Sequence, residues 1–410
     1  MNHRHKTQGE GSVDEPDQGH ELPEPDGPEV VSSGRSRSAA RIAGRSVVAF
    51  ASVVVLGLSA VGWFVIDRLS EVSSAKVLAE VPHAPPPDDG ATDVLLVGSD
   101  SRTDAQGNPL PLKVLKQLRT EATGGLNTDS LVLIRVPHSG AAPTAVSIPR
   151  DTYTETPSGN PDKINSVYGL TKKAAAEELE DQNLPAVEVE HRSKVAGQRA
   201  LVQTVQTLTG MRIDHYAEIN LLGFFELTDA VGGVEVCLNN ATSDKDSGAD
   251  FSAGRHTVTG GDALSFVRQR HGLPRGDLDR IVRQQVFMAA LANKVLSTGT
   301  LTDPAMVNDL TAATQRTVEL DEDWDALGFV QQMQQIAAGR VNFVTMPVLS
   351  AGARDERGQS IVSIDRAAVQ QFFAGLSANA PGLAPKPGLR LDGTARQRPI
   401  TSDGDVPCVN

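Results

Sequence analysis

The sequence predicts an α/β domain that follows a single membrane-spanning helix. From Thr92 to about Leu376, short apolar runs suited to strands alternate with segments whose apolar residues recur at helical spacing. A chain of 410 residues, 39% of them hydrophobic, is long enough to bury a sizeable core. An uncharged run of 20 residues at 47–66 has about the length of a helix that crosses a bilayer.

The segment before the domain sets the predicted membrane topology. Residues 1–46 are polar, acidic and proline-rich in their first part, which predicts a disordered tail. Arginines without an acidic residue among them precede the apolar run, and the positive-inside rule therefore places the tail in the cytoplasm. The predicted topology is therefore that of a single-pass protein of the cell membrane with an extracytoplasmic domain. A cleaved signal peptide is the alternative, but the run starts after more than forty residues and lacks a clear cleavage site.

The remaining boundaries follow from composition. Residues 67–91 end in VPHAPPPDDGA and predict a linker with a stiff proline spacer. The folded domain is expected at 92–376, and residues 377–410 are expected to form an extended tail. Cys237 and Cys408 both lie outside the membrane on this topology, where disulfides form and persist. We expect a disulfide between them that pins the tail; two free thiols are the alternative.

The charge distribution narrows the classes of function. The formal net charge of -13 argues against general nucleic-acid binding, which would need a basic face or stripe. Yet SFVRQRHGLPRGDLDRIVRQQ, at 265–285, contains five arginines. Arginines gathered at one place in an acidic protein suggest a local anionic partner. A solvated helix face is the ordinary alternative.

Three predicted strands bring charged residues to one edge of a sheet. They are DVLLVG at 93–98, SLVLIRV at 130–136 and TAVSIP at 144–149. The last two are joined by PHSGAAP, a segment of residues that favour turns, so they most simply form an antiparallel hairpin. With the turn centred near Ser139 and Gly140, Asp129 lies opposite Arg150. An ordinary surface salt bridge is the alternative for this pair.

The arginine-rich stretch predicts a helix, an extended segment and a second helix. Arg268 and Arg270 are two residues apart, which places them on the same side of an extended segment. The second helix has Asp277 as a candidate N-cap and presents Arg280 and Gln284 as i,i+4 neighbours. Converging guanidinium groups suit a pyrophosphate, and carboxylates beside such an anion suit Mg²⁺. Together these residues indicate phosphoryl transfer.

The order of these motifs resembles the LytR-CpsA-Psr family of membrane-anchored cell-envelope enzymes. The resemblance runs over about half the chain, through DVLLVGSDSR, NTDSLVLIRV, SIPRDTY, KINSVYG, a long block from GQRALVQ to VEVCL, and GDALSFVRQRHGLPRGDLDRIVRQQ. It implies an α-β-α domain with a central mixed sheet, and an apolar groove for a lipid beside a basic pocket. It also implies a phosphotransferase that moves a glycopolymer from a polyprenyl-pyrophosphate carrier onto peptidoglycan through a phosphodiester bond.

The resemblance assigns roles to single residues. The catalytic residues would be Asp100, Asp129 and Arg150, and the two aspartates would hold Mg²⁺ (or Mn²⁺). The residues that would bind the pyrophosphate are Arg102, Arg150, Lys163, Arg268, Arg270, Arg280, Arg283 and Gln284, with Asp151 and Arg275 as outer candidates. The implied partners are the lipid-linked glycan, peptidoglycan and the membrane, with no nucleic acid.

Several questions stay open at this point. Either Asp100 or Asp129 could be the base, and a hydrolase of the same lipid-linked pyrophosphate would use the same residues. A non-enzymatic envelope regulator is a third class, although the short acidic tail has no evident DNA-binding motif. Asp279 could orient Arg280 or serve the helix alone, and His271 could be an acid or base or a hydrogen-bonding loop residue. The groove candidates Leu221, Leu222, Phe224, Phe225 and Leu227 could equally be plain core.

Overall fold

The computed structural model describes residues 73–79, 81–82, 84–86, 89–104, 108–120, 126–296, 303–322, 324–335, 340–377, 400–402 and 405–410. The chain divides into two units, Met1–Ala60 and Val61–Asn410, and every element below belongs to the second. The predicted tail at 1–46 and membrane helix at 47–66 lie outside the described residues. Among the residues that are described, no helix is both long enough and apolar enough to cross a membrane.

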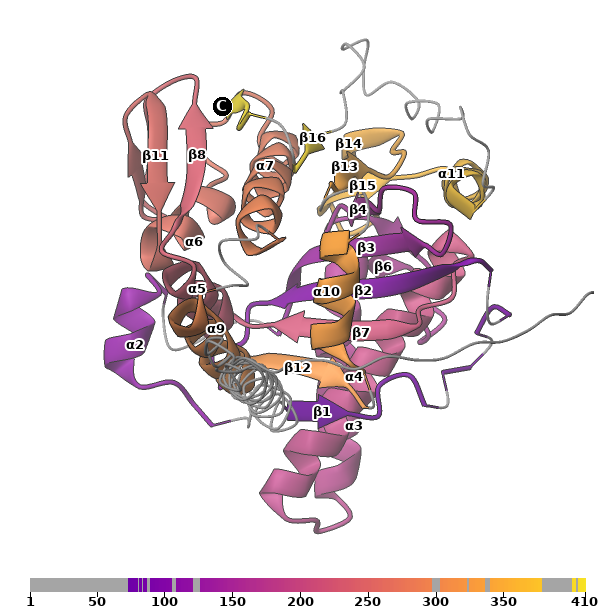
Figure 1. Cartoon of the computed structure of the whole chain (residues 1–410). Coiled ribbons are helices and arrows are strands. Elements are labelled where there is room, and N and C mark those ends of the chain that lie inside the picture. The colour runs from indigo at the N-terminus through magenta and orange to yellow at the C-terminus, as the bar shows by residue number, and fades with distance from the viewer. Residues whose placement is uncertain are drawn as a thin grey trace, which may run out of the picture. The chain divides into compact units, whose positions relative to one another are not determined.

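A mixed sheet of eight strands forms the centre of the domain (Figure 1), in the order β1-β12-β7-β2-β3-β4-β13-β16. The strands are Ser73–Ala75 (β1), Val318–Asp321 (β12), His215–Ile219 (β7), Ala91–Ser99 (β2), Thr128–Pro137 (β3), Thr144–Ile148 (β4), Asn342–Thr345 (β13) and Ile400–Thr401 (β16). The pairs β1–β12, β2–β7 and β4–β13 are parallel, and the other neighbours are antiparallel. The predicted α/β class with a central mixed sheet is therefore confirmed.

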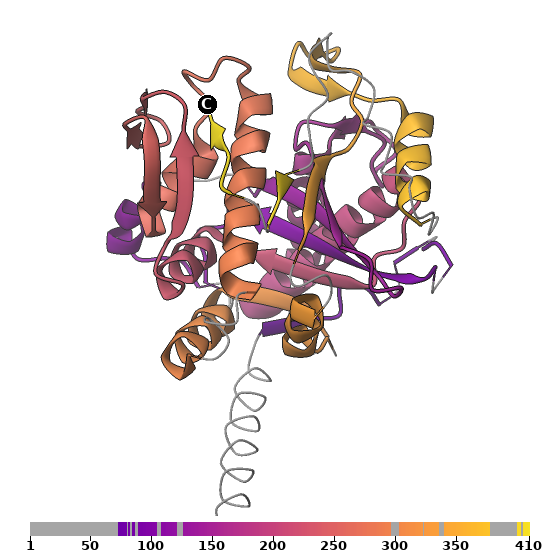
Figure 2. The same ribbon diagram turned by 45° about the horizontal axis from the view of Figure 1, so that its top comes forward.

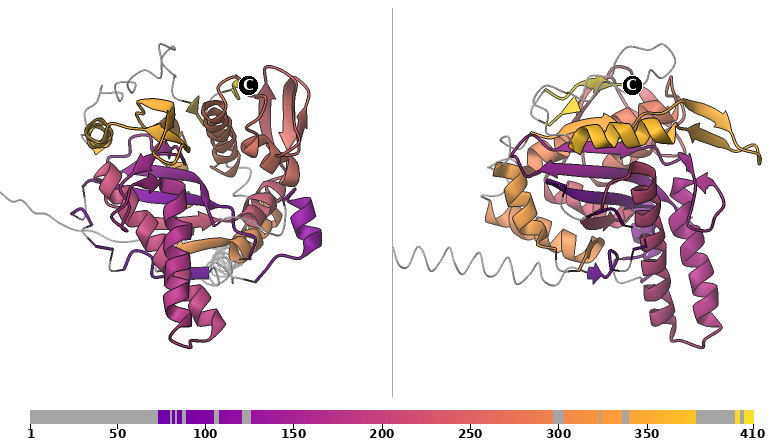
Figure 3. Two further views of the ribbon diagram at one scale, coloured as in Figure 1. Left: turned by 180° about the vertical axis from the view of Figure 1, so that it is seen from behind. Right: turned by 90° about the vertical axis from the view of Figure 1, so that its right-hand side faces the viewer.

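Helices cover both faces of this sheet (Figures 2 and 3). On one face lie α3 (Ile164–Glu180), α4 (Ala186–Thr209) and α11 (Arg366–Ser377), and on the other lie α7 (Asp277–Leu296) and α10 (Ala326–Gln335). The two-residue period of β3 explains this, because successive side chains of a strand point to opposite faces. Leu131 and Leu133 join the core under α3 and α4, while Val132 and Val136 pack against α7 and α10.

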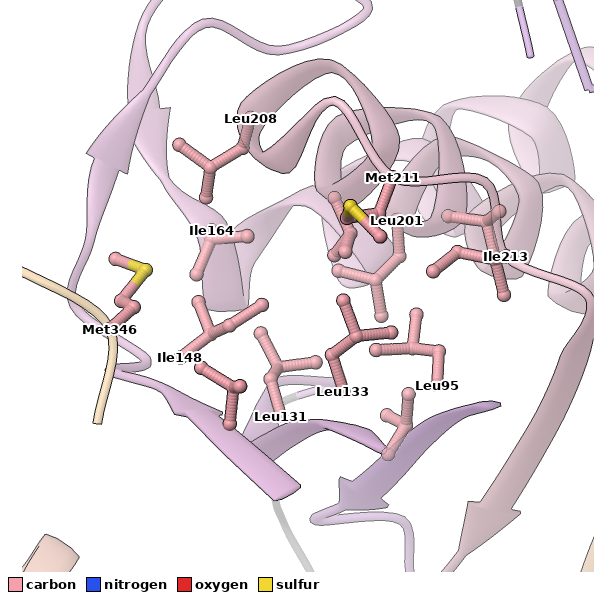
Figure 4. Close-up of a cluster of buried hydrophobic side chains, with 14 of the residues drawn as sticks. Leu95, Leu131, Leu133, Ile148, Ile164, Leu201, Leu208, Met211, Ile213 and Met346 are labelled. Carbon is pink, nitrogen blue, oxygen red and sulfur yellow. The ribbon is translucent and has the colours of Figure 1, made fainter. Parts of the chain in front are cut away.

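The core under α3 and α4 is the larger of the two (Figure 4). Strand residues such as Leu95 and Leu133 meet Leu201 and Ile164 from the helices, and all four side chains are almost fully buried. Burying a leucine or isoleucine side chain contributes about 2 kcal/mol. This face of the sheet is therefore a rigid support for the residues at the strand ends.

A second, three-stranded sheet in the order β11-β8-β17 stands beside the central one. It consists of Gly254–Val258 (β11), Val234–Leu238 (β8) and Cys408–Val409 (β17), and it packs on α5 (Leu221–Ala230), α6 (Gly260–Arg268) and α7. Helix α7 contacts both sheets, since Phe287 packs toward the second sheet and Ala289 toward the central one. The other described elements are α2 (Leu112–Gln117), α9 (Pro304–Thr317), β5 (Tyr153–Thr154), β6 (Asp162–Lys163), β9 (Thr242–Asp244), β10 (Ala249–Phe251), β14 (Ser350–Arg354) and β15 (Ser360–Ser363).

Two predicted boundaries differ from the structure. Part of the predicted linker at 67–91 is strand β1, which pairs with β12 at the edge of the central sheet. The predicted tail at 377–410 contains β16 in the central sheet and β17 in the second sheet, so its described part is built into the fold. Strands of two or three residues are too short to show an alternating pattern, and composition therefore could not reveal them.

The predicted disulfide between Cys237 and Cys408 is confirmed. It joins β8 to β17, where the two cysteines lie directly opposite each other in the parallel pair. The cysteines are 171 residues apart in the sequence. Such a bond restricts the unfolded chain over a long loop, and longer loops gain more stability.

We expect the double variant Cys237→Ser/Cys408→Ser to lose about 4 kcal/mol of unfolding free energy, because the unfolded chain regains the freedom that the closed loop removes. Urea titration of the oxidised protein and of the variant would measure this. Each single serine variant, kept reduced, should match the double variant. Equal denaturation midpoints for oxidised protein and variant would contradict the expectation.

Candidate active site

A cavity of about 380 Å³ lies between strands β7, β2 and β3 of the central sheet and helices α5, α6 and α7. Its apolar wall is formed by Leu96, Val97, Val132, Ile219, Leu221, Phe224, Leu264, Val267, Phe287, Met288 and Leu291. Its charged side is formed by Asp129, Arg150, Arg268, Arg270, Arg280, Gln284, Asp244, Asp246 and His271. Arg270, Asp246 and His271 are exposed, so the charged side faces solvent. An apolar hollow with a few converging polar groups is typical of a ligand site.

The hairpin of β3 and β4 places Asp129 and Arg150 side by side, as predicted. Its antiparallel register pairs Leu131 with Ile148. Two residues before Leu131 and two residues after Ile148, position 129 therefore lies opposite position 150. Arg150 Nη1 donates a hydrogen bond to Asp129 Oδ1 at 2.5 Å. The arginine side chain is largely buried, whereas that of Asp129 is 37% exposed. The pair therefore fixes both groups at the charged side of the cavity.

Asp100 lies beside this pair but does not line the cavity. It follows strand β2 directly, and Arg102 Nη2 approaches its Oδ2 atom at 3.4 Å. Burial raises the pKa of the Asp100 carboxyl, and the charge of Asp129 raises it further, while Arg102 and Arg268 oppose the shift. Its Oδ1 atom is buried and has no hydrogen-bond partner among the residues that the structure describes. Asp100 and Asp129 are thus close enough to repel each other.

Helix α6 ends where the sequence predicts a change to extended backbone. Gln269 follows it with φ −54° and ψ 133°, so that Arg268 and Arg270 both line the cavity. Their direct contacts are long: Arg268 Nη1 lies 3.4 Å from the Leu118 carbonyl oxygen. Arg270 Nε lies 3.5 Å from Asp277 Oδ1. The two guanidinium groups are therefore positioned mainly by their backbone.

Helix α7 begins at Asp277 and brings Arg280 and Gln284 to the same cavity, as predicted. The Arg280 side chain is 4% exposed and pairs with Asp277 at 2.8 Å. Burial, and then the charge of Arg150, lower the pKa of Arg280 to about 10, so the group stays protonated at neutral pH. Gln284 Nε2 donates to the Val267 carbonyl oxygen at 3.3 Å, which ties α7 to α6.

Three predicted phosphate ligands do not line the cavity. Lys163 pairs with Asp151 at 3.2 Å, and Asp151 in turn lies 3.9 Å from Arg150 Nε. Arg102 donates to Thr120 Oγ1 at 2.8 Å. Arg283 is fully buried behind the cavity, where its Nη1 atom donates to Gln269 Oε1 at 2.7 Å. The full burial of Arg283 corrects the prediction that it binds the pyrophosphate directly. For Lys163 and Arg102, which keep partly exposed side chains away from the lining, a role in binding the pyrophosphate stays a prediction.

Asp279 and Arg275 also lie away from the cavity lining. The Asp279 carboxylate accepts from the backbone N–H of Arg275 at 2.9 Å and from its Nε atom at 2.8 Å. Asp279 therefore holds the loop before α7 and does not orient Arg280. Of the apolar groove candidates, Leu221 and Phe224 line the cavity. Leu222 and Phe225 pack near α2, and the fifth, Leu227, packs near β12.

The sequence analysis missed an acidic loop at the charged side. Asp246 Oδ2 lies 3.1 Å and Asp244 Oδ1 3.6 Å from His271 Nδ1, and all three residues line the cavity. Burial alone would raise the pKa of Asp244, but hydrogen bonds from the Asp246 backbone and the Ser247 hydroxyl lower it. No spacing in the sequence signals that this loop meets His271, and the contact becomes visible only in the folded chain.

Comparison with known proteins agrees with this geometry. The sequence profile of the LytR_cpsA_psr family matches residues 68–377. The chain belongs to this family. It is 49% identical over 374 residues to the "Cell wall biosynthesis protein LcpA" of Corynebacterium glutamicum, which covers 89% of this chain and 71% of that protein. The resemblance inferred from the ordered motifs is therefore confirmed.

Other members of the LytR_cpsA_psr family extend the comparison. The "Polyisoprenyl-teichoic acid--peptidoglycan teichoic acid transferase TagU" of Bacillus cereus is 31% identical over 58% of this chain and 63% of its own length. The solved structure of B. subtilis TagV has a TM-score of 0.51 at 20% identity, over 70% of this chain and 96% of that one. A LytR-Csp2A-Psr enzyme from Actinomyces oris has a TM-score of 0.51 at 18% identity, over 74% of this chain and 94% of that one. These two structures share the fold.

If the charged side is an anion site, Arg268→Ala should weaken the binding of inorganic pyrophosphate about tenfold, because one charge-assisted hydrogen-bonding group is lost. Isothermal titration calorimetry at fixed ionic strength would measure the dissociation constants. Arg255→Ala is the matched control, since Arg255 is exposed, pairs with Glu235 and does not line the cavity. Equal losses in the two variants would mean that only net charge matters.

Proposed function

We propose that this protein is a membrane-anchored phosphotransferase that moves a glycopolymer from a polyprenyl-pyrophosphate carrier onto peptidoglycan through a phosphodiester bond. The observation that carries the proposal is the arrangement of four arginines at one side of an apolar cavity. The names of its relatives support it, since LcpA is a cell wall biosynthesis protein and TagU a teichoic acid transferase acting on peptidoglycan.

The cavity suits both parts of a lipid-linked pyrophosphate. Guanidinium groups form forked hydrogen bonds with phosphate oxygens, and Arg150, Arg268, Arg270 and Arg280 could serve two adjoining phosphates. The wall of leucine, valine and phenylalanine side chains could bury the first isoprene units of the carrier and so remove them from water. A free sugar phosphate would leave this wall without an occupant. The pairing of the two surfaces favours a lipid-linked donor over a soluble one.

The two aspartates fit a divalent cation. In the described part of the chain, one buried carboxylate oxygen of Asp100 has no hydrogen-bond partner, and the raised pKa of Asp100 reflects burial and the nearby charge of Asp129. Two carboxylates beside substrate phosphates are the usual protein ligands of Mg²⁺, and Mn²⁺ also prefers such oxygen ligands. Asp100 and Asp129 would hold the ion. When bound, it would neutralise charge on the phosphates during transfer.

The acceptor hydroxyl has to lose a proton during transfer, and Asp129 is the better placed of the two carboxylates to take it. It lines the cavity and is partly exposed, whereas Asp100 lies behind the lining. The hydrogen bond from Arg150 to Oδ1 orients the carboxylate. A base must reach the proton before its pKa matters, so geometry decides here. Arg150, Arg268, Arg270 and Arg280 would stabilise charge on the transferring phosphoryl group and the departing polyprenyl phosphate.

The anchor in this proposal is the apolar run at 47–66, with the N-terminus in the cytoplasm and the catalytic domain outside it. The family match starts at residue 68, directly after that run. A catalytic domain tethered this way meets its lipid-linked donor at the bilayer surface.

The test is reconstitution of the full chain with a labelled polyprenyl-pyrophosphate glycan, peptidoglycan oligomers and Mg²⁺. We expect label to move onto peptidoglycan, and Asp129→Asn to slow the transfer at least a hundredfold, because the variant loses both the proposed base and a carboxylate ligand of the ion. Asp250→Asn, at an exposed aspartate of β10, is the matched control and should be as active as the natural protein.

The products distinguish the candidate functions. Release of free glycan phosphate without transfer would identify a hydrolase of the same donor. A donor that neither binds nor reacts would refute an enzymatic role for the cavity. Omission of Mg²⁺ with added chelator should abolish transfer if Asp100 and Asp129 hold the ion. Full activity under those conditions would remove the metal from the proposal.

A further inference from the structure

Arg283 and Gln269 form a buried pair directly behind the arginines of the cavity. Both side chains have no exposed surface, and Arg283 Nη1 donates to Gln269 Oε1 at 2.7 Å. Arg283 belongs to α7, whereas Gln269 lies at the end of α6, between Arg268 and Arg270. The pair therefore links the helix that carries Arg280 to the segment that carries the two other arginines.

Gln269 fixes the local course of the backbone. Its Nε2 atom donates to the His271 carbonyl oxygen at 3.0 Å and to the Thr242 hydroxyl, and its backbone N–H donates to Ser265. Successive residues of an extended segment point to opposite sides. Because the side chain of Gln269 points inward to Arg283, its two neighbours are left on the side of the cavity.

Arg283 is unsuited to a surface or ligand-binding role. It does not line the cavity, its Nε atom donates to the main-chain oxygen of Asn410, and its guanidinium lies 5.1 Å from the centre of the Phe266 ring. Burial lowers its pKa to about 10, so it stays charged at neutral pH. A buried charge is expensive unless several partners satisfy it. The planar fork of arginine reaches Asn410, Gln269 and the Phe266 ring at once, which a lysine cannot do, although its Nη2 atom has no hydrogen-bond partner among the described residues.

The arginines that this pair supports have little else to hold them. Among the described residues, the side-chain contacts of Arg268 and Arg270 are 3.4 and 3.5 Å long, close to the limit for a useful hydrogen bond, and the backbone N–H of Arg270 donates to Asp244 Oδ2 at 3.3 Å. Two guanidinium groups that converge on one anion also repel each other before the anion binds. Their separation therefore depends on how firmly the backbone from residue 268 to residue 270 is held, to which Gln269 and the Asp244 carboxylate both contribute.

We propose that Arg283, acting through Gln269, is a positioning residue that holds Arg268 and Arg270 at the spacing needed to bind a pyrophosphate. The identity of the ligand rests on the proposed function. The positioning itself is a property of the fold and can be measured without any ligand. Arg283 thus acts on the site only through Gln269 and does not touch the substrate.

The test compares Arg283→Met, Gln269→Met and the double variant in the full chain. Hydrogen–deuterium exchange of the ligand-free protein should show faster uptake in the peptide that spans residues 266–272. Uptake in the double variant should be no faster than in Gln269→Met, because that single variant already breaks the link to Arg283 together with the bonds to Thr242 and His271. Gln285→Met is the matched control, since this amide is equally buried on α7 but bonds to Ser147 and Thr345 in the central sheet.

Binding of geranyl pyrophosphate and of geraniol provides the second readout. We expect both single variants to bind the pyrophosphate about tenfold more weakly and the uncharged alcohol as before, because only the arginines are displaced. A general loss of structure would weaken both ligands and would also appear in Gln285→Met. Arg283→Lys should behave like Arg283→Met, as it keeps the charge but not the fork.

The outcomes separate the inference from the proposed function. Unchanged uptake at 266–272 in Arg283→Met would overturn the positioning role, whatever Gln269→Met shows and even if the natural protein binds the pyrophosphate. Uptake that rises to the same extent in Gln285→Met would also overturn it. If the natural protein binds no pyrophosphate while the segment still loosens in the variants, the positioning role stands and the proposed function fails.

Discussion

The mutual repulsion of four arginines around one cavity is the constraint that shapes the rest of the site. Guanidinium groups gathered out of bulk water destabilise a fold unless acids or hydrogen bonds offset their charge. Here Asp129 holds Arg150, and Asp277 lies against both Arg280 and Arg270. The hairpin register, the start of α7 and the turn after α6 each bring one of these groups into place. The carboxylates that pair with these arginines are thus as necessary for the stability of the site as the arginines are for its positive charge.

The parts of the site that could be predicted from the sequence depend on short-range geometry. A hairpin with a recognisable turn fixes its own register, so the neighbouring positions of Asp129 and Arg150 follow from counting residues. The spacing of two between Arg268 and Arg270, and of four between Arg280 and Gln284, likewise determines a shared side once the local structure is known. The disulfide could be predicted for a different reason, since the chain contains only two cysteines.

The parts that could not be predicted depend on contacts between distant segments. Arg283 is three residues after Arg280, which is helical spacing for the same general face, yet it turns to Gln269 and Asn410. Nothing in the local sequence distinguishes a charged residue that binds a ligand from one that supports its neighbours. Lys163 and Arg102 illustrate the same limit, because their partners Asp151 and Thr120 lie on other loops. The acidic loop that meets His271 belongs to this class as well.

The apolar wall and the charged side of the cavity depend on each other physically. Hydrogen bonds between arginine and phosphate are weak in water and become stronger where water is excluded. A lipid tail that covers Leu264, Val267 and Phe287 would remove water from the space beside Arg268 and Arg280. Binding energy from the tail could then strengthen the contacts that stabilise the transferring phosphoryl group. Under the proposed function the carrier lipid would be part of the catalytic environment, and this would account for the arginines and the hydrophobic wall sharing one cavity.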